Sequence, residues 1–154
     1  ISGILKWGPS EDFPIEDFER ILKINTTGVR RSFVGKLAAA TIVYVGTLVA
    51  RNAAGNIVPA SDTANLKVVG VAMATVDNSA GAASAKEVQI GVGVFEFGNA
   101  GGAIVLASSH GLCYVADDQN VTTAAVATND IIAGVVEGYT TTTVLVDVDP
   151  VYSL

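Results

Sequence analysis

The chain has 154 residues, enough for one domain with a sizeable core, and half of them are hydrophobic while only 16% are charged. Its net charge is −6 and no basic cluster exceeds the pair Arg30–Arg31, which argues against binding to a nucleic-acid backbone. Typical globular chains carry roughly 25% charged residues, so little charge is available here to cover a large free surface. We therefore expect other copies of the chain or another protein to cover part of it; the alternative is a compact monomer with a surface of Thr, Ser and Asn.

Residues 1–35 differ from the rest and predict an extended N-terminal arm. They hold the only tryptophan, Trp7, and three of the five phenylalanines. A short helix is predicted over about 14–23, because a proline suits the first helical turn, acidic residues follow it and basic residues stand near its end. Phe18 and Ile21 share one face of this helix. An isolated helix of about ten residues is marginal in water, so we expect that face to dock on something.

Residues 36–154 are predicted to form a mainly β domain. Short segments rich in β-branched residues alternate with turns that contain glycine. The predicted strands cover about residues 41–51 (one bent strand or two short ones, with Gly46 at the bend), 57–59, 67–76, 87–98, 111–118, 131–139 and 140–149. Seven to nine short strands at this spacing predict a small antiparallel β-barrel or sandwich.

The segment 87–98 is the clearest of these strands. Four branched side chains share one face, at Val88, Ile90, Val92 and Val94. The opposite face carries Gln89, Gly91, Gly93 and Phe95. Low-bulk strands of this kind suit a tightly wound barrel, in which glycine relieves crowding. The small residues 77–86 before it predict a loop that either packs on a neighbouring molecule or only stays soluble.

Cys113 and His110 are the only cysteine and histidine of the chain. Cys113 stands in the apolar sequence GLCYV, so we interpret it as a buried small hydrophobe rather than a nucleophile. It has no cysteine with which to form an internal disulfide. A catalytic pair with His110 would need a third group to orient the histidine, and none is apparent. One histidine and one cysteine are also too few for a zinc site made by this chain alone.

The acidic residues form no recognisable catalytic or metal-binding pattern. The stretch 117–120 lacks the spacing and the distal glutamate of a calcium-binding EF-hand, so we interpret it as a solvated turn. Asp147 and Asp149 share one face of the last strand, where we expect them to face water rather than a cation. Glu87 and Glu96 lie about 30 Å apart if their segment is one extended strand, too far for the roughly 10 Å or less of a glycosidase pair.

Motifs for nucleotide binding and hydrolysis are also missing. No helical pattern follows the glycines at 91, 93 and 98, no phosphate-binding loop with its GK[ST] ending is present, and no serine stands in GxSxG. We therefore expect no enzyme activity, cofactor or metal. The most apolar run, residues 37–50, is shorter than the roughly 20 residues of a membrane helix, and no secretory signal opens the chain, so we expect no membrane partner.

Much of the chain resembles the capsid decoration, or cement, proteins of bacteriophages. The resemblance is carried by YVGTLVARNAAGNIVPASDTANLKVVGVA (44–72), VDNSAGAASAKEVQIGVGVFEF (76–97), GLCYVADDQNV (111–121), AGVVEG (133–138) and VLVDVDP (144–150). Their order and spacing, over about residues 42–149, carry it rather than any single motif. Residues 1–35 fall outside it.

The resemblance implies a compact β-barrel, usually a homotrimer, on the outer surface of a phage head. Such proteins are made in the cytoplasm of the host bacterium and become part of the virion. They fasten neighbouring major capsid subunits against the pressure of the packaged DNA and are not enzymes. The resemblance therefore implies the major capsid protein and further copies of this chain as partners.

The arm supplies the residues that we expect to bind these partners, whether the capsid or a sister subunit. Aromatic and apolar anchors of the kind that carry interface energy are Trp7, Phe13, Phe18, Ile21 and Phe33. The alternative for each is packing against its own barrel. Arg30 and Arg31 either pair with an acidic capsid surface or form an ordinary solvated pair.

Two other functions remain open. The first is a trimeric β module of a phage tail or fibre that binds a host surface glycan, for which the β region offers only a few aromatic residues. The second is a small hydrolase with an unrecognised site.

Overall fold

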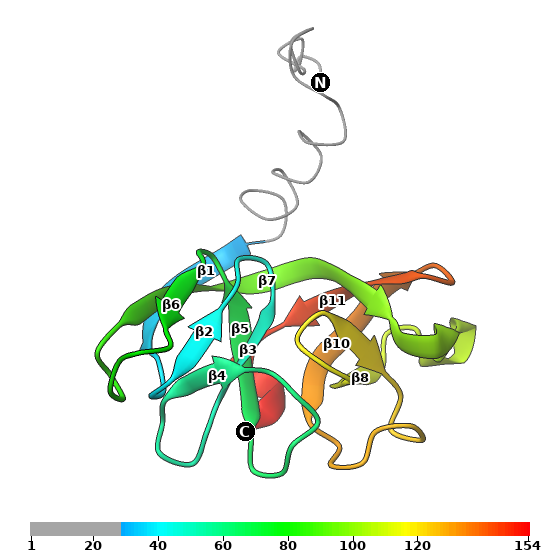
Figure 1. Ribbon diagram of the computed structural model, residues 1–154. Coiled ribbons are helices and arrows are strands. Elements are labelled where there is room, and N and C mark those ends of the chain that lie inside the picture. Colours follow the sequence, from blue (N-terminus) through cyan, green and yellow to red (C-terminus); the bar gives the residue numbers. More distant parts are fainter. Residues whose placement is uncertain (1–28) are drawn as a thin grey trace, which may run out of the picture.

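The computed structural model describes residues 29–154, and strands make up about half of that part of the chain. The helical segments there are short 3₁₀ turns: η3 (Ala100–Gly102), η4 (Leu106–Ser108) and η5 (Pro150–Ser153). The predicted mainly β class is confirmed (Figure 1). The helix predicted over 14–23 and most of the arm lie outside the described residues.

Five strands close into a barrel, which decides between the two predicted architectures. They are β7 (Glu87–Asn99), β8 (Leu112–Val115), β9 (Asn120–Thr122), β10 (Ile132–Tyr139) and β11 (Thr143–Val148). The ring runs β7–β11–β10–β8–β9 and returns to β7, and all its pairings are antiparallel except that of β7 with β9. Closure removes the exposed edges that an open sheet would leave.

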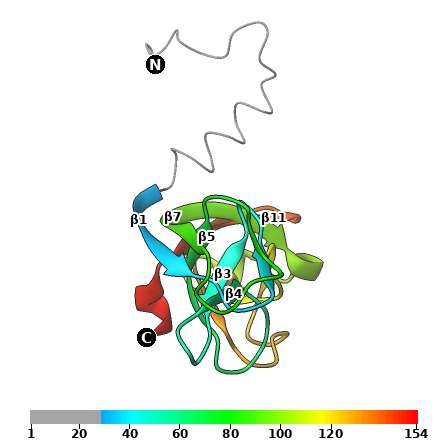
Figure 2. The same cartoon turned by 60° about the vertical axis from the view of Figure 1, so that its left-hand side comes forward.

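A second group of strands surrounds the N-terminal half of β7. They are β1 (Val29–Lys36), β3 (Leu48–Arg51), β4 (Ile57–Pro59) and β5 (Lys67–Ala72). The strands β1 and β5 both pair with β7, β3 pairs with β5, and β4 pairs with β3. A parallel bridge between Leu37 and Ile57 brings β4 back to the end of β1. Figure 2 shows β1 beside β7, with the C-terminal turn η5 on the same side of the molecule.

The predicted segment 41–51 is two strands rather than one bent strand. The first, β2 (Thr41–Val43), pairs with β6 (Val76–Asn78) in a separate two-stranded sheet, and the second is β3. Gly46 lies in the turn between them with a φ of +86°, a conformation that favours glycine. The prediction of a break at Gly46 is confirmed.

The strand β7 contributes to two cores that lie against its opposite faces. Val88 and Ile90 belong to a smaller core, whose other buried members are Leu37, Val43, Val49, Ile57, Val69 and Ala72. Phe95 and Phe97, on the other face, belong to a larger core inside the barrel. The face of β7 that carries the four branched side chains is buried as far as Val92, but Val94 is only half-buried. The buried side changes because β7 leaves the wall of one core and enters the wall of the other.

The strands β3 and β5 separate the two cores. In β3, Leu48 and Ala50 face the larger core while Val49 faces the smaller one. In β5, Val68 and Val71 face the larger core, and the residues between and after them face the smaller one. A strand buried on both faces needs apolar side chains at successive positions, which explains the unbroken apolar run of β5.

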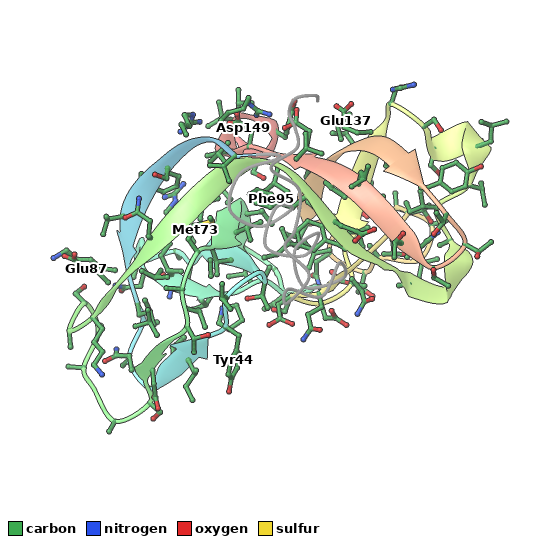
Figure 3. The ribbon with its side chains drawn as sticks, turned by 90° about the horizontal axis from the view of Figure 1, so that it is seen from above. Tyr44, Met73, Glu87, Phe95, Glu137 and Asp149 are labelled. Carbon is green, nitrogen blue, oxygen red and sulfur yellow. The ribbon has the colours of Figure 1, made fainter. Side chains whose placement is uncertain are left out.

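Glycines allow β5 and β7 to approach each other closely. A Cβ at Gly70 would lie 2.5 Å from the carbonyl oxygen of Gly91. A Cβ at Gly91 would lie 2.6 Å from the sulfur of Met73, which covers that part of β7 (Figure 3). The close approach of β5 and β7 therefore requires residues without a side chain at positions 70 and 91.

The arm ends earlier than the sequence predicted. The sequence placed the boundary between residues 35 and 36, but residues 29–35 are part of β1 and pair with β7. Phe33 packs on the smaller core, and Gly35 lies so close to Ile57 that a Cβ would meet its side chain at 2.5 Å. The sequence did not predict this strand, because charged residues occupy some of its exposed positions and only its other face is partly buried.

We expect Gly70→Ala to lower the free energy of unfolding by about 1–3 kcal/mol, the usual cost of forcing extra volume into a packed interior. The added methyl group meets backbone at Gly91, which cannot rotate away as a side chain can. Urea unfolding followed by circular dichroism measures the change.

The matched control is Gly138→Ala in β10, where the added Cβ would meet only Leu145 at an ordinary 3.7 Å. We expect this variant to stay within about 0.5 kcal/mol of the parent. Equal losses in the two variants would contradict the close crossing of β5 and β7.

Candidate functional site

Three of the seven predicted partner-binding residues lie in the described part of the chain. Arg30, Arg31 and Phe33 all belong to β1, the first described strand. The other four, Trp7, Phe13, Phe18 and Ile21, lie outside the described residues. Phe33 is half-buried against the smaller core, so it packs on its own barrel, the alternative that the sequence left open.

An ion-pair network, here called the junction cluster, joins the start of β1 to the end of β11. Arg30 donates from Nη1 to Asp147 Oδ1 at 2.6 Å and from Nη2 to Asp149 Oδ2 at 3.0 Å. Arg31 donates from Nη2 to Asp149 Oδ1 at 3.1 Å, and the hydroxyl of Tyr152 donates to Asp147 Oδ2 at 2.9 Å. The cluster lies where residues 1–28 enter the described structure.

The aspartates of the junction cluster are much less accessible than its arginines. The side chains of Asp147 and Asp149 are each 14% exposed, against 46% for Arg30 and 55% for Arg31. Burial opposes ionisation of Asp149, but hydrogen bonds from Val151 N and Arg30 and the charges of both arginines outweigh it and lower its pKa. The hydrogen bond to Asp147 raises the pKa of Arg30.

These contacts revise two expectations from the sequence. Asp147 and Asp149 bind arginines instead of facing water alone, and Arg30 and Arg31 are paired within their own chain. The partners are separated by 117 to 119 residues, so local spacing in the sequence carried no sign of the pairing.

The loop 77–86 packs on its own chain, which neither sequence alternative anticipated. The buried side chain of Asn78 donates to the carbonyl oxygens of Ala38 at 2.9 Å and Ala82 at 3.0 Å. The amide of Ser84 donates to Leu37 O at 2.8 Å. A Cβ at Gly81 would lie 2.0 Å from Asn78 Oδ1, so the small residues of the loop leave room for the asparagine that holds it.

The described residues include the cysteine and the acidic turn that the sequence analysis considered for chemistry. Cys113 is buried, and desolvation raises its pKa to about 12, so it is a neutral thiol as its apolar context predicted. Asp117 accepts hydrogen bonds from Gln119 N and from the side chain of Asn120, so it closes its own turn. Among residues 29–154, no group of three or more His, Cys, Asp or Glu side chains is placed to hold a metal ion.

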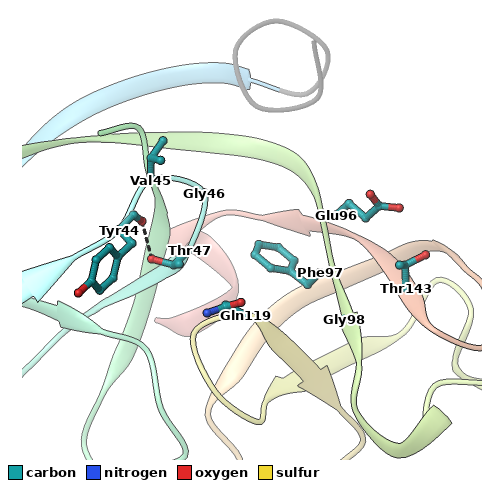
Figure 4. Close-up of a pocket in the computed structure, with 9 residues that line it drawn as sticks. All are labelled: Tyr44, Val45, Gly46, Thr47, Glu96, Phe97, Gly98, Gln119 and Thr143. Carbon is teal, nitrogen blue, oxygen red and sulfur yellow. Dashed lines mark hydrogen bonds between the residues drawn. The ribbon is translucent and has the colours of Figure 1, made fainter. Parts of the chain in front are cut away.

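An open hollow of about 450 Å³ lies between the β2–β3 turn and the adjoining strands β7 and β11 (Figure 4). Tyr44 and Val45 on its rim are 55% and 47% exposed. The hydroxyl of Thr47 donates to Tyr44 O at 2.7 Å and thereby stabilises the turn. Phe97, Gln119 and other residues complete the lining. An aromatic rim with amide and hydroxyl groups suits a contact surface.

A row of side chains that is apolar except for Asp147, here called the outer apolar face, crosses the outside of the barrel. Val135 in β10 lies between Leu112 in β8 and Asp147 in β11 and is directly opposite both. Asp147 is in turn opposite Val94 in β7. Leu145 lies two residues from Asp147 on the same face of β11. Leu112 and Leu145 are 44% and 39% exposed. The row thus reaches the junction cluster through Asp147.

Comparisons with protein-family models, with curated proteins and with solved structures gave no match to this chain. Among the described residues, no helix is long and apolar enough to span a membrane. The functional argument therefore depends on the residues and their geometry.

We expect Asp149→Asn to lower the free energy of unfolding by about 1 kcal/mol at pH 7, a charged hydrogen-bond value discounted for the exposure of both arginines. Because the pKa of Asp149 is lower in the folded than in the unfolded chain, this stabilisation is complete above a pH of about 4. It is lost as the pH falls through the folded-state pKa. Urea unfolding at neutral and acidic pH measures it.

Asp130→Asn is the control, since Asp130 forms no ion pair with any residue in 29–154 and should change stability little at either pH. A deficit in Asp149→Asn that stays the same at acidic pH would show that the charge of Asp149 does not stabilise the junction cluster.

Proposed function

We propose that this chain is a structural protein of a bacteriophage virion that binds the outside of the head and fastens neighbouring major capsid subunits. The observation that carries the proposal is the outer apolar face, a row on a closed barrel in which Leu112 and Leu145 are exposed and Val94 and Val135 are partly buried. Apolar rows of this kind favour a protein partner. The resemblance of residues 42–149 to capsid decoration proteins gives that partner its identity.

The construction of the barrel supports a role under mechanical load. The ring of five strands is closed, and buried asparagines hold its loops in place. The side chain of Asn99, for example, donates to the carbonyl oxygens of Ile104 and Thr140 and accepts from Ile104 N. A shell protein that resists the pressure of packaged DNA needs such stiffness. Assembly as a homotrimer belongs to the same proposal, and sedimentation velocity tests it.

A glycan-binding module of a phage tail or fibre is the second candidate. The hollow beside Tyr44 favours it, because an exposed aromatic ring stands there with the side chains of Gln119 and Thr143. Electron microscopy of the particle separates the two candidates, since a decoration protein lies on the shell and a fibre module projects from the tail.

We expect the double variant Leu112→Glu with Leu145→Glu to bind phage heads at least about tenfold more weakly, because two carboxylates would be desolvated in the apolar contact. Both side chains are exposed enough for the fold to remain, which circular dichroism checks. Co-sedimentation with heads that lack the protein measures binding.

Val126→Glu is the matched control, since Val126 is 63% exposed and lies outside the outer apolar face. Unchanged binding by the double variant, or equal weakening by the control, would count against this face as the contact with the capsid.

We expect deletion of residues 1–28 to leave a folded barrel that binds heads more weakly, because β1 is preserved while the predicted anchors Trp7, Phe13, Phe18 and Ile21 are lost. Deletion of residues 1–35 should also destabilise the domain, since it removes the strand that pairs with one edge of β7. Thermal unfolding and co-sedimentation distinguish the two truncations. Full binding by the shorter truncation would exclude the arm from the capsid contact.

A further inference from the structure

A hollow of about 490 Å³ between the ends of β3 and β5 has an unusual charge arrangement. Its lining, here called the basic hollow, consists of Arg51, Asn52, Ala53, Asn65, Leu66 and Lys67. It combines two cations with two side-chain amides and one half-buried leucine. No acidic side chain is among them.

The two cations of the basic hollow stand directly opposite each other in the register of β3 and β5. Like charges at directly opposed positions of an antiparallel pair destabilise a sheet. The side chain of Lys67 donates to the carbonyl oxygen of Ser153 at 3.0 Å, and the side chain of Arg51 has no hydrogen-bond or ion-pair partner within residues 29–154. The hollow therefore offers an unneutralised site to a carboxylate ligand.

Asp130 is the one acidic residue in the adjoining smaller hollow, which it lines together with Leu66 and Lys67. Arg51 does not line that hollow, and Asp130 does not line the basic hollow. No ion pair joins Asp130 to Lys67 in the described structure. The positive charge of Arg51 is thus left for another part of the chain or a partner.

The chain itself contains a segment of complementary chemistry. Residues 11–19, with the sequence EDFPIEDFE, carry five of the 15 acidic residues of the protein within nine positions. Phe13, Ile15 and Phe18 alternate with these carboxylates, so the segment can place acidic groups on Arg51 and Lys67 and an apolar side chain on Leu66. Arginine pairs with carboxylates in a two-pronged geometry that suits such a contact.

The path from this segment to the basic hollow is short. Asp149 binds Arg30 and Arg31 at the start of β1, and Ser153, at the other end of η5, binds Lys67. A 3₁₀ turn rises about 2 Å per residue, so Asp149 and Ser153 lie roughly 8 Å apart. The ten steps from Glu19 to Val29 span up to about 33 Å when extended. The segment can reach the hollow on its own barrel without strain.

We propose that the acidic segment 11–19 docks into the basic hollow of its own chain. Its carboxylates neutralise the opposed pair Arg51 and Lys67, and the contact keeps the N-terminal arm on the barrel of the free protein. This inference is independent of the proposed function, because it concerns the protein alone and its test contains no capsid. The same segment from a second copy is the competing occupant.

A nitroxide label at Ala53→Cys in the full-length, isotope-labelled chain tests the proposal by nuclear magnetic resonance. Cys113 is buried and remains unlabelled. We expect the amide signals of residues 11–19 to lose intensity by about twofold or more at low salt. They should recover at high salt, because the screening length falls from about 30 Å at 0.01 M to about 3 Å at 1 M.

Two controls define the site. A label at Leu106→Cys, in an exposed turn of the barrel, should leave the signals of residues 11–19 unchanged. With the label at position 53, the substitutions Arg51→Gln and Lys67→Gln should restore those signals, while Lys36→Gln should not. The dispersed signals of the strands verify that each variant is folded.

A mixing experiment shows whether the segment in the basic hollow comes from the same chain or from a second copy. It combines isotope-labelled chains that carry no nitroxide with chains that carry the nitroxide but no isotope label. We expect no broadening in this mixture, because the contact lies within one chain. If the signals of residues 11–19 broaden in the mixture as strongly as in the chain that carries both labels, the hollow binds the segment of a second copy and the proposal is overturned. Absence of broadening at residues 11–19 in the first experiment would overturn it as well.

Discussion

The fold depends on one long strand, β7, being shared by two cores. Along one of its edges, β1 and β11 follow each other end to end, and both reach Gly93: Val29 and Val148 are each opposite it. Along the other edge, β5 pairs near Gly91 and β9 pairs at the end of the strand. A strand with four partner strands has little room for bulky side chains at the positions where one partner ends and the next begins. Gly91 leaves room for Met73, Gly93 has a φ of +151° that favours glycine, and the two halves of the domain cannot separate without breaking β7.

The loops follow a second rule, in which an asparagine fills the space that a neighbouring glycine leaves. Asn78 lies against Gly81, and Asn120 Oδ1 would lie 1.9 Å from a Cβ at Gly98. Each amide then binds a group of its own loop: Asn78 donates to Ala82 O, and Asn120 donates to Asp117. Asn78 also donates to Ala38 O, which ties its loop to the segment between β1 and β2. This pairing explains how a chain with so few charges keeps its turns ordered, because side-chain amides supply the hydrogen bonds that water would otherwise provide.

The sequence predicted what depends on local patterns and missed what depends on distant partners. Segments rich in β-branched residues located β7, β10 and β11, with the clearest alternation of period two in β7, and Gly46 marked the break between β2 and β3. That alternation alone did not reveal that the buried side changes along β7, since this requires knowing that a second core lies on its other face. Predicting the position of β1 would have required pairings between residues more than 50 positions apart. The ion pairs of Arg30 join residues 117 and 119 positions apart. The asparagines were overlooked because a polar residue in a turn looks solvated until its acceptors are known.

The junction cluster connects these features to the proposed role. Residues 1–28 join the barrel at Val29, where β1 pairs with β7 through seven residue pairs and its arginines bind the end of β11. Tension that reaches β1 through Val29 would be resisted by these backbone pairs and ion pairs. The load would pass directly to β7 and β11, the strands that carry Val94 and Leu145 of the outer apolar face. In the proposed role, an arm bound to one capsid subunit and a face bound to another would thus be joined through the paired strands β1, β7 and β11.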